Sequence, residues 1–214
     1  MILAVALNAA LDVTYRVDGK VRPHSAHRVR AVEAAAGGKA LNVARVLHTL
    51  GTPVLSTGLL GGRTGVEIAE RIPAGLRHSF AAVAGESRRA VVVADDADAT
   101  GFWEPGPQVT AEEWESFWRR YVALLRVSTV AVLSGSLPCG LPDDTYARMT
   151  AEARRAGVAV IVDCDGPALR AALSARPDVV KPNAAELAAA VPDVDVSTDA
   201  GATAAARRLR EAGA

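Results

Sequence analysis

The sequence has little of several features that would mark particular classes of protein. Its 214 residues include only two cysteines, Cys139 and Cys164, in separate segments without metal-site spacing. A disulfide framework is therefore not indicated, and we expect a reduced, cytoplasmic setting. The formal net charge is zero, from 24 basic and 24 acidic residues, so neither nucleic acid nor an anionic membrane is indicated as a partner. Any anion site must be local.

Long hydrophobic runs are also missing. The apolar residues 1–11 have no basic residue ahead of them and reach Asp12 too early for a membrane span or a secretory signal. We interpret them as a first buried strand. Because 50% of the residues are hydrophobic and 22% are charged, the chain can bury a core, and we treat residues 1–214 as one domain.

Short apolar runs alternate with helical patterns, which is typical of a mostly parallel sheet with helices on both faces. The predicted strands are residues 2–7, 54–60, 130–133, 158–162 and 179–180. A helix is predicted at residues 41–50, before Gly51, and another at 200–212. A further strand would be expected after that last helix, where the sequence has Gly213 and Ala214, so the C-terminal part of the sheet is expected to be absent.

One helix carries most of the aromatic residues. Thr110 and Glu113 predict a capping box at its start. Its aromatic residues recur at intervals of three and four, and they are Trp114, Phe117, Trp118 and Tyr121. A stripe at helical spacing is normally a buried face, so we interpret it as packing rather than as a ligand platform.

Two stretches break the alternation. Residues 13–33 and 88–102 have turn residues but no helical period, and they predict a small β-lid within the domain.

Glycines open the predicted helix at residues 41–50. Gly37 and Gly38 would let backbone N–H groups approach a ligand at the helix N-terminus, while Lys39 and Asn42 add side-chain donors. A tight loop before a helix explains the pattern equally well. The run is not a Walker A loop, because Ala40 stands where Ser or Thr must hold magnesium.

Other polar motifs follow predicted strands. Asp12 comes just after the first strand, where a carboxylate suits sugar hydroxyls, although a turn-forming Asp is an alternative. Ser136 lies in a small-residue run after the strand at 130–133. Lys181, Asn183 and Glu186 follow the strand at 179–180. Asn183 and Glu186 suit either a hydrated Mg²⁺ with phosphate oxygens or a plain capping box. Together these motifs predict one site at one edge of the sheet.

The same motifs, at residues 7–12, 36–45, 134–138 and 181–186, closely resemble those of the ribokinase-like (PfkB-type) sugar kinases. The sequence is most similar to the 1-phosphofructokinase and tagatose-6-phosphate kinase branch, to which residues 104–107 also point. The resemblance implies a ribokinase-like α/β fold with a β-lid. It also implies a homodimer formed through the lid.

The resemblance further implies roles for individual residues. The implied substrate-binding set is Asp12, Arg28, Gly37, Gly38, Lys39, Asn42, Arg88 and Ser136. Arg28 and Arg88 would meet the sugar's phosphate, which an arginine fork matches well. Lys181 and Asn183 would approach the phosphates of ATP, and Glu186 would organise Mg²⁺ through water.

Several positions depart from the family pattern. Ala9 replaces a proline and Ala40 a glycine, and a methyl group at Ala40 would be costly if that position needs positive φ. The larger departure is that the Gly-Ala-Gly-Asp turn, which supplies the family's catalytic base, does not occur before Ala214. We therefore expect no catalytic base in this chain, a base beyond Ala214, and little turnover from these residues alone.

The activity implied by the resemblance is ATP-dependent phosphorylation of fructose 1-phosphate to fructose 1,6-bisphosphate, with Mg²⁺, in the cytoplasm. Tagatose 6-phosphate and fructose 6-phosphate are alternative acceptors. A non-catalytic sugar-phosphate binder and an inactive fragment are the alternatives from other classes.

Overall fold

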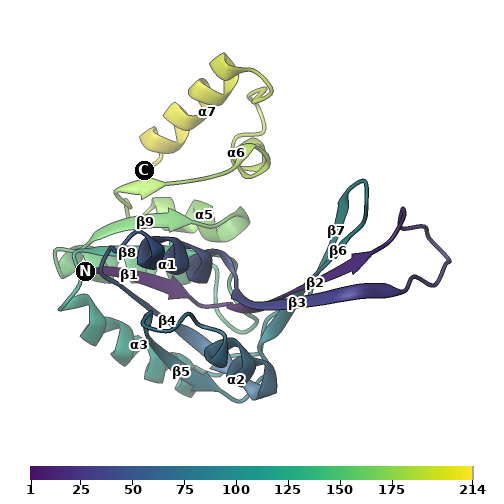
Figure 1. The fold of residues 1–214 in the computed structure, drawn as a ribbon. Helices are drawn as coiled ribbons and strands as arrows, with labels where there is room; N and C mark the ends of the chain where they lie inside the picture. The colour runs from purple at the N-terminus through teal and green to yellow at the C-terminus, as the bar shows by residue number, and fades with distance from the viewer. Residues whose placement is uncertain (214) are drawn as a thin grey trace.

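The computed structural model describes residues 1–213, which form a main sheet flanked by helices and a small sheet that projects from it (Figure 1). The main sheet contains β1 (Ile2–Ala6), β4 (Val54–Gly61), β5 (Arg77–Val83), β8 (Val130–Ser134), β9 (Ala159–Asp163) and β10 (Val179–Val180). The small sheet contains β2 (Ala10–Val17), β3 (Val29–Gly37), β6 (Arg88–Ala94) and β7 (Ala99–Trp103). The helices are α1 (Lys39–Thr49), α2 (Gly62–Glu70), α3 (Ala111–Leu125), α4 (Thr145–Arg155), α5 (Gly166–Leu173), α6 (Ala184–Ala190) and α7 (Asp199–Glu211).

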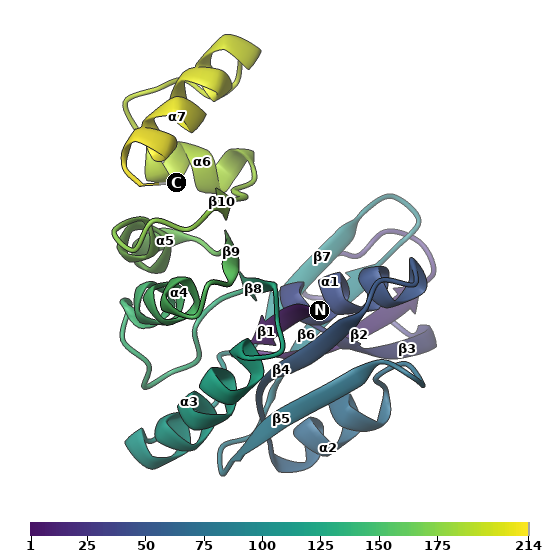
Figure 2. The same cartoon turned by 90° about the vertical axis from the view of Figure 1, so that its left-hand side faces the viewer.

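The main sheet is parallel, with strand order β10-β9-β8-β1-β4-β5. Strand β1 lies inside the sheet, and its alternate residues serve two separate cores. Leu3 and Val5 belong to the core beneath α3, α4 and α5, whereas Ala4 and Ala6 belong to the core beneath α1 and α2. Helices therefore cover both faces, as the view in Figure 2 shows, and the predicted α/β class, with a mostly parallel sheet between two layers of helices, is confirmed.

The five predicted strands of the main sheet all occur, with ends that differ by no more than one residue. Strand β5 was not predicted. It begins with Arg77, His78 and Ser79, which hide the apolar pattern, and it lies at the edge of the sheet, where one side of its backbone needs no partner. An edge strand with a polar start lacks the buried run by which the other strands were found.

The small sheet has the order β3-β2-β6-β7 and includes the stretches predicted to be extended. Its strands begin earlier than predicted, at Ala10, and continue later, to Gly37, where β3 leads directly into α1. At its outer end, carboxylates of Asp95 and Asp96 accept hydrogen bonds from the backbone N–H groups of Val21 and Gly19. These contacts join the β2–β3 connection to the β6–β7 turn.

The last two helices form a separate small core with α5. Leu173, Leu187 and Leu209 are buried in this cluster, and α7 occurs where the sequence predicted the last helix. The predicted absence of a strand after it concerns Ala214, which lies outside the described residues. No helix within residues 1–213 is both long enough and apolar enough to span a bilayer.

Helix α3 confirms the predictions made for it. The Thr110 hydroxyl accepts a hydrogen bond from the Glu113 N–H, and the Glu113 carboxylate accepts one from the Thr110 N–H. Phe117 and Tyr121 are fully buried, so the aromatic stripe is a packing face.

We expect Thr110→Ala to lower the free energy of unfolding by about 1 kcal/mol, because it leaves the Glu113 N–H without its acceptor. Urea denaturation measures this change. Ser116→Ala is the matched control, since Ser116 is exposed in the middle of the same helix and we expect no loss there. Equal effects of the two substitutions would contradict the capping argument.

Candidate functional site

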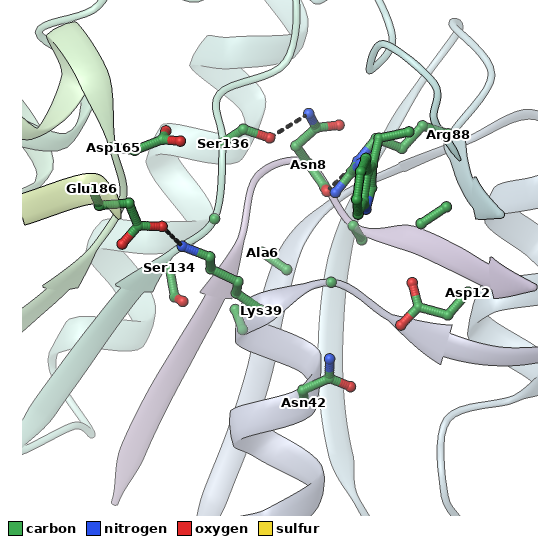
Figure 3. A pocket seen from close by; sticks show the side chains of 16 residues that line it. Ala6, Asn8, Asp12, Lys39, Asn42, Arg88, Ser134, Ser136, Asp165 and Glu186 are labelled. Atoms are coloured by element: carbon green, nitrogen blue, oxygen red, sulfur yellow. Dashed lines mark hydrogen bonds and ion pairs between the residues drawn. The ribbon is translucent and has the colours of Figure 1, made fainter. Parts of the chain in front are cut away.

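A pocket of about 500 Å³ opens at the carboxyl ends of β1 and β8, between the main sheet and the small sheet (Figure 3). Strand β1 pairs with β4 on one side and β8 on the other, and the chain continues from β1 toward β4 but from β8 toward β9, so these two connections run to opposite sides of the sheet. Such a switch in strand order is where open α/β sheets bind ligands. The pocket is lined by Ala6, Asn8, Ala9, Asp12, Gly38, Lys39, Ala40, Asn42, Arg88, Ala90, Trp103, Ser134, Gly135, Ser136, Asp165 and Glu186.

The carboxylate of Asp12 lies against the backbone at Gly37 and Gly38. A Cβ atom at Gly37 would overlap this carboxylate, so glycine is required there for Asp12 to keep its position. Burial raises the pKa of Asp12, although a hydrogen bond from Gly38 and the positive charges of Arg88 and Arg45 act in the opposite direction. The site therefore holds Asp12 in a partly desolvated place suited to accepting hydrogen bonds from a ligand.

Arg88 approaches the pocket from the small sheet. Its Nε donates to the backbone oxygen of Asn8 at 3.1 Å, which fixes the guanidinium beside the end of β1. Its terminal nitrogens make no hydrogen bond or ion pair with any other group in residues 1–213, and burial lowers the pKa of Arg88. The free part of the fork is available to a ligand's anionic group.

Asn8 also holds the loop after β8. Its Nδ2 donates to Ser136 Oγ at 3.0 Å, and Figure 3 shows this contact at the upper rim of the pocket. Gly135 has φ of 106°, its N–H donates to the Asp163 backbone oxygen, and its own oxygen accepts from the buried Tyr146 hydroxyl. The loop is thus held from three directions, and it presents small polar groups to the pocket.

A cluster of charges occupies the other end of the pocket. Lys39 Nζ donates to Glu186 Oε1 at 2.8 Å and to Asp163 Oδ1 at 3.2 Å. Lys181 Nζ lies 3.3 Å from the same Asp163 oxygen, and Ser134 Oγ donates to the other. Burial acts to lower the pKa of Lys39, but the two carboxylates outweigh it and the pKa is raised. Lys39 therefore stays charged.

Glu186 is the capping residue that its spacing from Asn183 suggested, and it also lines the pocket. The two residues form a complete capping box at the start of α6, in which Glu186 Oε2 accepts from the Asn183 N–H at 2.9 Å. The other oxygen of Glu186 meets Lys39 in the pocket. Burial raises the pKa of Glu186, but the contacts with Lys39 and the Asn183 N–H outweigh it and leave the pKa lowered.

The donor set indicates how a divalent cation would be held. Among residues 1–213, no group of three or more His, Cys, Asp or Glu side chains is arranged to hold a metal ion. Both oxygens of Glu186 already accept hydrogen bonds from protein groups. Mg²⁺ keeps most of its waters and needs few protein carboxylates, so these residues fit contact through water rather than a protein cage.

The pocket brings together seven of the residues singled out from the sequence, namely Asp12, Gly38, Lys39, Asn42, Arg88, Ser136 and Glu186. Gly37 and Asn183 lie directly behind this lining, against Asp12 and Glu186, and Lys181 joins through Asp163. Arg28 does not reach the pocket of its own chain. It is exposed just before Val29, at the outer end of β3, roughly 26 Å of strand away from Gly37.

Ala40 carries no backbone strain. It lies inside α1 and is fully buried, and the residues with positive φ other than glycine are His24 and Arg176 within residues 1–213. The conformation under which its methyl group would be costly therefore does not occur.

Sequence reasoning missed four residues of the site. Asn8 and Asp163 come directly after predicted strands, and Asp165 follows two residues later, so their position was a usable signal. Trp103 had no such signal, because it ends β7 in the small sheet and reaches the pocket only through the pairing of β7 with β6.

A parallel α/β sheet with a polar pocket at its switch point, covered by a small sheet, defines the chain as a ribokinase-like protein. The sequence matches the description "pfkB family carbohydrate kinase" over residues 2–214. The chain belongs to the pfkB family of carbohydrate kinases, which confirms the resemblance found in its motifs.

Solved structures of known proteins support this assignment. A possible 1-phosphofructokinase from Thermotoga maritima is 30% identical with a TM-score of 0.89, and the match covers 99% of this chain and 69% of that chain. Phosphofructokinase-2 from Escherichia coli, in its tetrameric inhibited form and in complex with fructose-6-phosphate, is 25% identical with a TM-score of 0.88, covering 99% and 70%. Ribokinase from Arabidopsis thaliana, at 18% identity and a TM-score of 0.70 over 99% and 69%, shares the fold.

We expect Asp12→Asn to gain stability relative to the natural protein as the pH rises. Because burial raises the pKa of Asp12 above its unfolded value of about 4, its contribution to stability is most favourable below that value and declines as the pH rises through the folded pKa. Asparagine cannot titrate. The difference in free energy of unfolding should therefore grow from about pH 3 to about pH 7.

Urea denaturation of both proteins at a series of pH values measures this difference, in which the other titrating groups cancel. A difference that shrinks as the pH rises would show that Asp12 is not desolvated in the folded protein.

Proposed function

We propose that this pocket binds a ketose monophosphate as the acceptor of a phosphoryl group from ATP. The observation that carries the proposal is that one pocket has two groups of charged side chains, one at each end. Arg88 and Asp12 lie at the end formed by the small sheet, whereas Lys39, Asp163 and Glu186 lie at the end formed by β9 and α6. Figure 3 shows the small side chain of Ala6 between Lys39 and Asp12.

The end near the small sheet suits the acceptor. Asp12 and Asn42 offer carboxylate and amide groups for sugar hydroxyls, and the free nitrogens of Arg88 suit the phosphate that the acceptor already carries. The E. coli relative, solved in complex with fructose-6-phosphate, supports an acceptor of this chemical class. We propose fructose 1-phosphate as the acceptor, with tagatose 6-phosphate and fructose 6-phosphate as its competitors.

The end near α6 suits the donor. Lys181 is exposed beside Asp163, and Lys39 lies between Asp163 and Glu186, so two ammonium groups face the place where nucleotide phosphates would lie. When bound, MgATP supplies the transferable phosphoryl group and the charge neutralisation that this transfer needs. Lys39 and Lys181 would orient its phosphates, and Glu186 would contact Mg²⁺ through water.

We assign no general base to any of residues 1–214. The family's Gly-Ala-Gly-Asp turn does not occur in the sequence, and phosphoryl transfer depends on positioning and charge stabilisation around the nucleophile. We therefore propose that the 214-residue chain binds the acceptor and shows little or no turnover. A coupled ADP-release assay that gives ordinary kinase rates from this chain would contradict that part of the proposal.

We also propose that the small sheet acts as a lid and pairs with the lid of a second copy. The sheet face away from the pocket exposes apolar side chains, with Val32 61% and Phe102 59% exposed. A two-fold pairing would cover this face with itself, and the E. coli relative is described as tetrameric. In such a pair Arg28, which is remote from its own pocket, would be available to the pocket of the second copy. The cytoplasmic location remains a prediction.

We expect Arg88→Ala to weaken binding of fructose 1-phosphate by about 10- to 100-fold, because it removes charge-assisted hydrogen bonds to the phosphate. Isothermal titration calorimetry measures the affinity. Arg89→Ala is the matched control, since Arg89 follows on the same strand, points to the other face and is exposed. Equal losses in the two variants, or binding of unphosphorylated fructose with equal affinity, would contradict the role of Arg88.

We expect Val32→Asp to turn the dimer into a monomer, because a buried unpaired carboxylate opposes the pairing of two apolar faces. Sedimentation velocity measures the change. Val127→Asp is the control, because Val127 is 58% exposed but lies between α3 and β8, away from the small sheet. A natural protein that is already monomeric would refute the proposed pairing.

A further inference from the structure

Trp103 is unusual among the residues of the pocket. It is 70% exposed, although burying an indole is among the larger hydrophobic gains available to a protein. The other two tryptophans, Trp114 and Trp118, pack against each other and against Phe117 and Tyr121 in α3. Trp103 takes part in no aromatic pair and no cation–π contact within residues 1–213. It is a large apolar group held at the mouth of a polar pocket.

The register of the small sheet places Trp103 in the same row as Asp12, two strands away from it. Trp103 pairs with Ala90 on β6, and Ala90 pairs with Asp12 on β2, so the three residues form one row across three strands on one face. All three line the pocket. Two strand spacings separate the outer members of the row by about 9.5 Å, and the small, buried Ala90 forms the floor between them.

The position of the indole is also determined by a small neighbour. Gly101 lies two residues before Trp103 on β7, and the six-membered part of the indole ring passes directly over it, so that a Cβ atom at Gly101 would meet the ring. Because Gly101 has no side chain, the indole ring can lie against the backbone of β7. The ring thus extends along β7 from the row of Asp12 and Ala90 toward Gly101, and its exposed apolar surface lines the same pocket as the Asp12 carboxylate.

A sugar ring has matching chemistry. Its hydroxyl groups need hydrogen-bond partners, whereas its C–H groups form an apolar face that gains from contact with an aromatic ring. We propose that Trp103 is a substrate-contacting residue, which packs against the C–H face of the ketose ring while Asp12 holds its hydroxyls and Arg88 its phosphate. This inference rests on the proposed function and specifies how the acceptor is held.

The test compares variants of the 214-residue chain by calorimetry with fructose 1-phosphate and with inorganic phosphate. We expect Trp103→Ala to weaken fructose 1-phosphate binding by about tenfold and to leave phosphate binding unchanged, whereas Trp103→Phe should stay within about threefold of the natural protein. Because Trp103 is exposed, its removal should not lower the melting temperature. Trp118→Phe is the matched control and should change neither affinity.

Fluorescence gives an independent readout. Fructose 1-phosphate should change the tryptophan emission of the natural protein and of Trp118→Phe, and this change should disappear in Trp103→Phe. If Trp103→Ala binds fructose 1-phosphate as the natural protein does, or if the emission change persists in Trp103→Phe, the role of Trp103 is wrong and the proposed function stands. If the natural protein binds none of the three ketose phosphates, the proposed function fails and this inference fails with it.

Discussion

The site depends on the place where the strand order of the main sheet reverses. The chain leaves β1 toward β4 and β5 on one side and later builds β8, β9 and β10 on the other. The connections that follow β1 and β8 must therefore diverge, and a crevice remains between them at the carboxyl edge. The polar groups of the pocket follow from this arrangement, because Asn8, Ser136 and Asp165 each come just after a strand that ends there.

The charge cluster shows why these strand ends stay together. Asp163 is only 7% exposed, and a buried carboxylate is costly unless it is paired and hydrogen-bonded. Lys39, Lys181 and Ser134 meet this need from three different elements. Lys39 in turn reaches Glu186 on α6, so one lysine at the start of α1 holds two carboxylates that lie 124 and 147 positions further along the chain. Removing Lys39 would take from Asp163 one of its two ion-pair partners, and from Glu186 its only ion-pair partner within residues 1–213.

Much of this could be predicted from the sequence, and the parts that could not have physical reasons. The buried strands and the capping boxes at Thr110 and Asn183 are local patterns, which the sequence carries directly. Glu186 proved to serve both as a capping residue and as a pocket residue, because its two oxygens point to different partners. Contacts such as Asn8 with Ser136 depend on strand order, which no local pattern encodes. The outward position of Arg28 depends on the length of the small sheet.

The connections to the small sheet explain how its residues can contribute to a precise site. Only residues 7–9 separate β1 from β2, and only Gly38 separates β3 from α1, so Asp12 and Lys39 are tied to the core by very short links. Gly38 has φ of 93° and Gly37 has no room for a side chain beside Asp12, so both positions need glycine for different reasons. Arg88 is tied to the same connection after β1, because its Nε donates a hydrogen bond to the backbone oxygen of Asn8. The acceptor end of the pocket therefore belongs mechanically to β1, although most of its side chains come from the small sheet, and a change in the connections to that sheet would move Asp12, Ala90 and Trp103 as one wall.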